Sequence, residues 1–246
     1  MITSSRIALH AVRAICCCVS VVVLLILAVG PLEGATLIFN TSDSQFDPGV
    51  DNQGWWSNSM PNIDFNANYF TGRSGVDELH SFFTFDLSSL SQTAVSATLE
   101  VVRYTYMSPD PTETLGLFDV TTDAATLNNN TGTSATIFAD LGSGTSYGTF
   151  VIPAYTFSDT ETLTFPLNAG AIANINASTG FFSIGGALLS LNPSNNFEFV
   201  FNTASSFGIQ RLIVETAAAA VPQPSTLILL AGGLVFLAGR ILRSKA

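Results

Sequence analysis

Short segments in which apolar and polar residues alternate dominate the middle of the chain. A period of two places successive side chains on opposite faces of a strand, so these segments predict half-buried β-strands. In 197–201 the pattern puts Phe197, Phe199 and Phe201 on one face, whereas in 97–106 Arg103 interrupts the alternation begun by Leu99 and Val101. The predicted strands are 35–39, 80–87, 97–106, 115–120, 149–152, 162–166, 181–189, 197–201 and 211–215.

Stretches rich in Asn, Thr, Ser and Gly, such as 128–133 and 140–148, separate these strands and predict turns. Two helical segments are expected: 169–177, capped by Asn168, and one turn at 123–128, capped by Asp123. Many short strands and little helix predict a mainly β fold, an antiparallel jelly-roll-type β-sandwich spanning residues 36–216. An open β-solenoid is the alternative, and the lack of a repeat of fixed period argues against it.

Apolar runs flank this region on both sides. Residues 1–35 predict a signal peptide, because basic residues precede the apolar run 14–30; an uncleaved signal anchor is the alternative. Residues 227–242 predict a C-terminal transmembrane helix, with a buried helix of a soluble domain as the alternative. Arg240, Arg243 and Lys245 form its basic stop, the last two in the cytoplasmic tail 243–246. Positive charge at both outer flanks predicts that residues 36–216 are exported.

The linker 217–226, directly before the C-terminal apolar run, carries a proline-bracketed polar motif. The motif consists of Val221, Pro222, Gln223, Pro224, Ser225 and Thr226. Together with the apolar run and the basic end, it resembles the PEP-CTERM tail of exported bacterial proteins, with Gln223 where that family has Glu. The resemblance implies that a membrane-embedded exosortase recognises and cuts the linker. The released protein would then reach the cell surface or the exopolysaccharide matrix.

A second resemblance covers about half of the region between the apolar runs. The blocks HSFFTFDLSSL (80–90) and VSATLEV (95–101) are similar to a recurring strand–loop–strand block of DNRLRE-type domains and related carbohydrate-binding-module-like sandwiches. The resemblance implies a jelly-roll fold, with Phe85 in the core and Asp86 capping the following turn. Its residues are structural and imply no particular ligand.

Charge and cysteine content exclude several functions. Cys16, Cys17 and Cys18 lie in the first apolar run, so a mature domain would have no disulfide and no Cys-based zinc site. Residues 36–221 contain three arginines, no lysine and 17 acidic residues, a formal net charge of −14. Such a surface repels phosphate backbones, which excludes nucleic acid as a partner.

Catalytic chemistry has little support in the sequence. His80 is the only histidine between the two apolar runs, and no pair of carboxylates stands out. The prediction is therefore a non-enzymatic surface or matrix protein. The alternative is a glycosidase or lyase acting on extracellular polysaccharide, which needs two acids converging about 5–10 Å apart.

Three aromatic residues are candidates for glycan binding. Trp55, Trp56 and Tyr69 lie among Asn and Asp residues, a setting in which rings can stack on sugar faces. The alternative places one tryptophan at the end of the sandwich and the other on its surface.

Calcium is the most credible cofactor. Asp43, Asp47 and Asp51 fall in one loop-like stretch, and hard carboxylate oxygens suit a structural calcium ion. A solvated acidic loop is the alternative. Asp119 and Asp123 form a second, weaker candidate pair.

Overall fold

The computed structural model of the chain describes residues 34–44, 46, 51–63, 68–155, 160–201 and 208–218. Residues Gly34–Ala217 form one compact unit. The expected signal peptide up to residue 33, the Pro222–Pro224 motif and the C-terminal apolar run all lie outside the described residues. No helix in the described part is both long enough and apolar enough to cross a membrane.

Strands are the main regular structure of the unit. They are β1 (Thr36–Asn40), β2 (Gln53–Ser57), β3 (Phe70–Ser74), β4 (Asp77–Asp86), β5 (Ala94–Arg103), β6 (Thr105–Met107), β7 (Thr112–Asp119), β8 (Ser146–Pro153), β9 (Glu161–Pro166), β10 (Phe181–Leu188), β11 (Phe197–Phe201) and β12 (Arg211–Thr216). The helices are α2 (Ala124–Asn129), α3 (Ala135–Leu141) and α4 (Ala169–Ala177).

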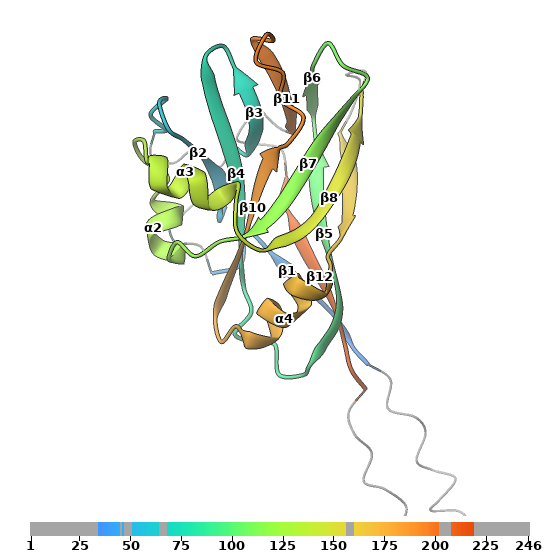
Figure 1. Cartoon of the computed structure of the whole chain (residues 1–246). Helices are drawn as coiled ribbons and strands as arrows, with labels where there is room; N and C mark the ends of the chain where they lie inside the picture. Colours follow the sequence, from blue (N-terminus) through green and yellow to red (C-terminus); the bar gives the residue numbers. More distant parts are fainter. Residues whose placement is uncertain are drawn as a thin grey trace, which may run out of the picture. The chain divides into compact units, whose positions relative to one another are not determined.

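The strands form two antiparallel sheets (Figure 1). One has the order β1–β12–β5–β9, and the other has the order β6–β11–β3–β4–β10–β7–β8, with β2 also pairing with β4. Leu79 of β4 pairs with both Ser57 of β2 and Gly72 of β3, so these two strands lie on opposite edges of β4. Strands β3 and β10 pair with successive parts of the other edge, and the larger sheet divides between them. The mainly β, antiparallel prediction is confirmed, and the architecture is consistent with a β-sandwich.

A single hydrophobic core joins the two sheets. Leu99 and Val101 of the smaller sheet pack in one cluster with Phe83 and Phe85 of the larger sheet, and all four are fully buried. The ring of Phe165 in β9 meets that of Phe201 in β11 edge-on, with centroids 6.3 Å apart. Full burial of such a side chain contributes about 1.5–3 kcal/mol, so this cluster is the main source of stability.

All nine predicted strand segments contain strands, and both predicted helical segments are helical. Asn168 and Asp123 cap their helices as expected, each accepting backbone N–H groups of the first turn. Phe85 is buried, and Asp86 accepts the backbone N–H of Ser88 at 2.9 Å, as the second resemblance implied. The predictions missed β2, β3 and α3.

Two predictions about strand faces were wrong. Phe197 and Phe201 do not share a face: Phe201 packs in the main core, whereas Phe197 is half exposed. The regular alternation of β11 ends at Phe201, which has φ +79°. Arg103 does not break the alternation of β5. It is 2% exposed and continues the alternate buried positions of Leu99 and Val101, since its charge is paired with Glu161.

Helices α2 and α3 cover a second apolar cluster on the larger sheet. Leu127, Ile137 and Leu141 from the two helices pack with Trp56 and Phe82. The approach of α3 depends on Gly185 in β10, where a Cβ atom would lie 2.5 Å from the carbonyl oxygen of Leu141. Any larger residue at that position would push the helix off the sheet.

The two ends of the unit leave it side by side. Strands β1 and β12 are paired from Thr36–Glu215 to Asn40–Arg211. Beyond them, Thr216 donates its N–H to Ala35, and Ala217 donates to Thr93, just before β5. Both ends of the unit therefore lie where β5 begins (Figure 1).

Candidate functional site

An open polar groove of about 330 Å³ lies at the tip of the β3–β4 hairpin. Its lining comprises Asn58 after β2, then Arg73, Gly75, Val76 and Glu78 of the hairpin, and Pro193, Asn195 and Asn196 of the β10–β11 loop. The backbone N–H of Gly75 donates to Asn196 at 2.6 Å, so the hairpin and the loop are joined. Gly75 has φ +68°, which the tight turn between the two strands requires.

Charged groups in the groove are held in place by a chain of contacts. Arg73 lies 3.6 Å from Glu78, and Glu78 lies 3.4 Å from Nε2 of His80. The hydrogen bond from His80 holds the pKa of Glu78 below its ordinary value of 4.5 despite partial burial, and Arg73 adds to this effect. The lining therefore carries one fixed cation and one fixed anion.

His80 connects the groove to α3. Its ring stacks on Phe138 with centroids 3.9 Å apart, and Nδ1 lies 2.7 Å from the Phe138 carbonyl oxygen. Gly142 lies against the ring, where a Cβ atom would be 2.4 Å from Cε1. His80 is therefore a packing and positioning residue.

Two buried glutamates fix the β10–β11 loop behind the groove. Glu198 accepts the N–H of Asn192 and the amide of Asn195, both at 2.6 Å. Glu113 accepts the hydroxyls of Ser190 and Ser108. The loop is therefore tied to the starts of β11 and β7, and Asn195 is held at the groove wall.

Asp110, Glu113 and Glu198 each bring a carboxylate oxygen within 4.8 Å of the others. Three hard oxygen ligands at this spacing could hold a calcium ion. Both glutamates, however, already accept the hydrogen bonds that hold the loop. At 1% and 0% exposure they also offer no opening to a substrate, which weighs against the paired acids of a glycosidase.

The prediction that Trp55, Trp56 and Tyr69 stack on sugars is wrong, because all three rings are buried, at 6%, 4% and 1% exposure. Trp56 donates its indole N–H to the Leu127 carbonyl at 3.0 Å, and Tyr69 donates to Val102 at 2.7 Å. The tryptophans occupy different apolar clusters, which the alternative of one tryptophan at the end of the sandwich and one on its surface did not anticipate.

The predicted calcium loop is described only in part, since Asp47 lies outside the described residues. Asp43 is exposed and accepts the backbone and side-chain amides of Asn40 at 2.9 and 3.2 Å. The second candidate pair is engaged elsewhere: Asp119 accepts the N–H of Thr145, and Asp123 caps α2. The calcium site at Asp43, Asp47 and Asp51 stays a prediction.

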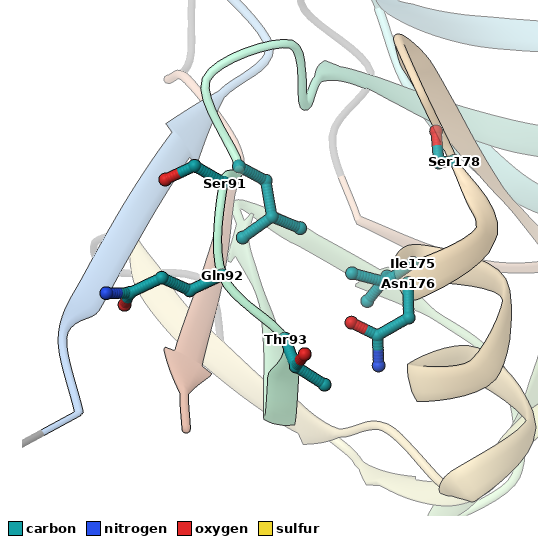
Figure 2. Close-up of a pocket in the computed structure, with 7 residues that line it drawn as sticks. Ser91, Gln92, Thr93, Ile175, Asn176 and Ser178 are labelled. Atoms are coloured by element: carbon teal, nitrogen blue, oxygen red, sulfur yellow. The ribbon is translucent and has the colours of Figure 1, made fainter. Parts of the chain in front are cut away.

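A second, smaller pocket of about 230 Å³ lies where the chain ends leave the unit (Figure 2). Asn176 of α4 and Gln92 of the β4–β5 loop line it. Both side chains already bind the protein: Asn176 exchanges two hydrogen bonds with the Ala94 backbone, and Gln92 accepts the Thr216 hydroxyl. Its polar groups thus hold the β4–β5 loop to α4 and β12, which leaves the groove as the better candidate site.

The sequence did not single out any groove residue. Arg73 carries the only clear signal, as one of three cations in the acidic region 36–221. The consecutive Asn195 and Asn196 were indistinguishable from the many Asn residues of other loops.

Comparisons with known proteins give little further guidance. No protein family and no curated protein matches the chain. Among solved structures, the chain is similar to the C-terminal family 22 carbohydrate-binding module of Clostridium thermocellum Xyn10B, at 9% identity and a TM-score of 0.27. The alignment covers 75% of this chain and 95% of that module. A TM-score this low does not establish a common fold, so function has to be argued from the side chains of this chain.

Proposed function

We propose that this chain is an exported, non-enzymatic protein of the cell surface or the exopolysaccharide matrix. In this proposal residues 1–35 direct export and residues 227–242 hold the protein in the membrane. A processing enzyme of the exosortase type then recognises the segment around Pro222 and Pro224 and releases the domain. Extracellular polysaccharide is the proposed partner.

The observation that carries this proposal is the placement of the two chain ends. Because β1 pairs with β12, the first and last described strands, which follow the first apolar run and precede the second in sequence, begin and end at the same place on the unit. A domain with both connections at one end can stand on a membrane through either segment without rearrangement. The sequence adds the proline-bracketed linker and the basic stop.

Fractionation of the native host, combined with intact-mass measurement, tests the proposal. The expected product is a soluble form that ends near Pro222 and co-purifies with polysaccharide. Recovery of the protein only in membranes with its full C-terminus would contradict release and leave a permanently anchored protein. Recovery from the cytoplasm would overturn export.

The alternative, an enzyme that acts on polysaccharide, can be tested at the buried carboxylates of Glu113 and Glu198. Removal of one acid of a catalytic pair costs several orders of magnitude in rate. We expect no reducing-end release from polysaccharides by the wild-type protein. Release that disappears in Glu113→Gln, with the fold retained, would favour the enzyme.

Structural calcium is proposed at Asp43, Asp47 and Asp51. An ion that binds only the native state raises its melting temperature. Chelation with EDTA should therefore lower the melting temperature of the wild-type protein but not that of Asp43→Asn. An unchanged wild-type value would remove calcium from the proposal.

A further inference from the structure

We infer that the polar groove between the β3–β4 hairpin and the β10–β11 loop binds a neutral sugar unit of an extracellular glycan. The inference rests on the proposed function for the origin of the ligand. It assigns a place and a ligand class to the glycan contact, which the buried rings of Trp55 and Trp56 cannot provide.

The groove offers the groups that vicinal hydroxyls require. A sugar hydroxyl both donates and accepts, so it is matched by a guanidinium beside a carboxylate and by carboxamides, which do both. Arg73 and Glu78 supply the first combination, 3.6 Å apart, with side chains that are 18% and 33% exposed. Asn58, Asn195 and Asn196 supply the second.

The charge of the lining selects against ionic ligands. One cation and one carboxylate balance each other, and Arg73 also donates to the Asn192 carbonyl at 3.0 Å. No second basic residue lines the groove to receive a phosphate, a sulfate or a uronate. The surrounding chain is strongly acidic and repels anions further. A neutral sugar meets neither obstacle.

The size of the groove limits the ligand to a short unit. Its volume of about 330 Å³ lies at the lower end of the roughly 300–1,000 Å³ range of small-molecule sites. A peptide ligand would need apolar pockets for its side chains, whereas the lining offers only Val76 and Pro193 as apolar residues.

The groove retains polar groups that the protein does not use. The side chain of Asn196 makes no hydrogen bond among the described residues, and Asn58 only accepts the Ser59 hydroxyl. In the smaller pocket, by contrast, the amides of Gln92 and Asn176 are engaged with β12 and with the Ala94 backbone.

The position of the groove suits recognition away from a membrane. Strand β5 begins beside Ala217 and continues into β6, which pairs with β11 just after Asn196. The ten residues of β5 span about 30 Å at roughly 3.3 Å per residue. The groove therefore lies at the end of the unit opposite the two chain ends (Figure 1).

Saturation-transfer NMR on the full chain tests the inference, in a detergent without a sugar headgroup. The probes are the methyl glycosides of glucose, galactose and mannose, with glucuronic acid as the anionic comparison. We expect saturation transfer to at least one neutral glycoside and none to glucuronic acid. The double variant N58A/N196A should weaken that binding at least tenfold, since two exposed amides leave the groove while the core is untouched. Asn129→Ala, on the exposed side of α2, should bind as the wild type does.

Equal binding by the wild type and N58A/N196A, both with an unchanged melting temperature, would overturn the inference. The absence of transfer to every neutral glycoside, or preferential transfer to glucuronic acid, would overturn it as well. Fractionation of the native host reports on export and release independently. A released matrix protein without sugar binding in the groove would thus refute only the inference.

Discussion

At the scale of single residues, the few charged side chains that leave the surface each have a defined structural partner. Arg103 pairs with Glu161 and donates to the Pro153 carbonyl at 2.6 Å. Glu198 holds a loop through two amides. A buried charge without such partners would cost several kcal/mol, so these residues act as positional constraints on the chain around them.

Glu78 should make the protein less stable in acid. Its pKa lies below the ordinary value of 4.5 in the folded protein, so the unfolded state takes up a proton first as the pH falls. The stabilisation from the ionised Glu78 carboxylate is complete above the ordinary pKa of 4.5 and is lost as the pH falls through the lower pKa of the folded protein. Glu78→Gln should therefore flatten the decline in melting temperature between about pH 5 and pH 3. Because Glu78 is partly exposed, we expect an effect below about 1 kcal/mol. Glu215→Gln, at a surface carboxylate, is the control, and an identical decline in both variants would contradict the prediction.

Glu198→Ala should be strongly destabilising. The change removes a buried carboxylate and leaves the partly buried hydrogen bonds to the Asn192 N–H and the Asn195 amide without their acceptor, at a cost of about 1–3 kcal/mol in all. Urea unfolding measures the loss. Glu215→Ala removes a carboxylate that accepts only the Thr36 hydroxyl at the surface, so it should cost less than about 0.5 kcal/mol. Similar losses in the two variants would show that Glu198 does not hold the loop.

At the scale of secondary-structure elements, the placement of α3 depends on two small residues. Gly185 lets Leu141 approach the surface of β10, and Gly142 leaves room for the ring of His80. The helix begins at Ser134, whose hydroxyl accepts the Ile137 N–H at 3.2 Å. Helix position is therefore set by close contact with the sheet and by one cap.

Gly185→Ala should displace α3 and destabilise the fold by about 1–3 kcal/mol, because the added methyl would lie 2.5 Å from the Leu141 carbonyl oxygen. Gly180→Ala is the matched control. A Cβ at Gly180 meets no atom within 4 Å, so this change should be neutral within about 0.5 kcal/mol. Denaturant melts of the two variants provide the comparison. Equal stability would mean that α3 can shift without loss.

Elements with a regular pattern were predictable from the sequence, and irregular ones were not. The alternation in β5 and the Asn168 cap of α4 identify both elements directly. Strand β2 was missed because all five of its residues are buried, so no polar position alternates with an apolar one. Strand β3 contains Gly72 at φ +128°, where the chain leaves regular strand geometry.

The candidate site was less predictable than the fold. The groove is assembled from the β3–β4 hairpin, a segment after β2 and the β10–β11 loop, which lie far apart in the sequence. The conspicuous tryptophans instead fill core positions, because a large ring gains more by burial than by exposure. Polar residues that come together only in the folded chain leave no recognisable pattern in the local sequence.

At the scale of the whole molecule, negative charge is the dominant surface property. Residues 36–221 carry a formal net charge of −14, and their three cations lie in pairs with Glu78, Glu161 and Glu100. Such an excess favours solubility and opposes compactness through self-repulsion.

Added salt should therefore stabilise the protein. Raising NaCl from about 10 mM to 150 mM shortens the Debye length from roughly 30 Å to 8 Å and screens this repulsion. We expect the melting temperature to rise by a few degrees, because repulsion between many acids outweighs a few surface ion pairs. An uncharged osmolyte at the same osmolality is the control. A fall in melting temperature with salt would indicate that ion pairs dominate.

The pairing of β12 with β1 and β5 also determines how the protein resists pulling. When a ligand held at the groove and an anchor beyond Ala217 are drawn apart, the load runs along β12. Its hydrogen bonds to both neighbours are then stretched together in shear, and no end can be peeled away one bond at a time. In the proposed anchored protein, the last strand before the anchor therefore has partners on both sides. That arrangement would give the domain mechanical strength along the axis on which flow or a moving matrix would pull.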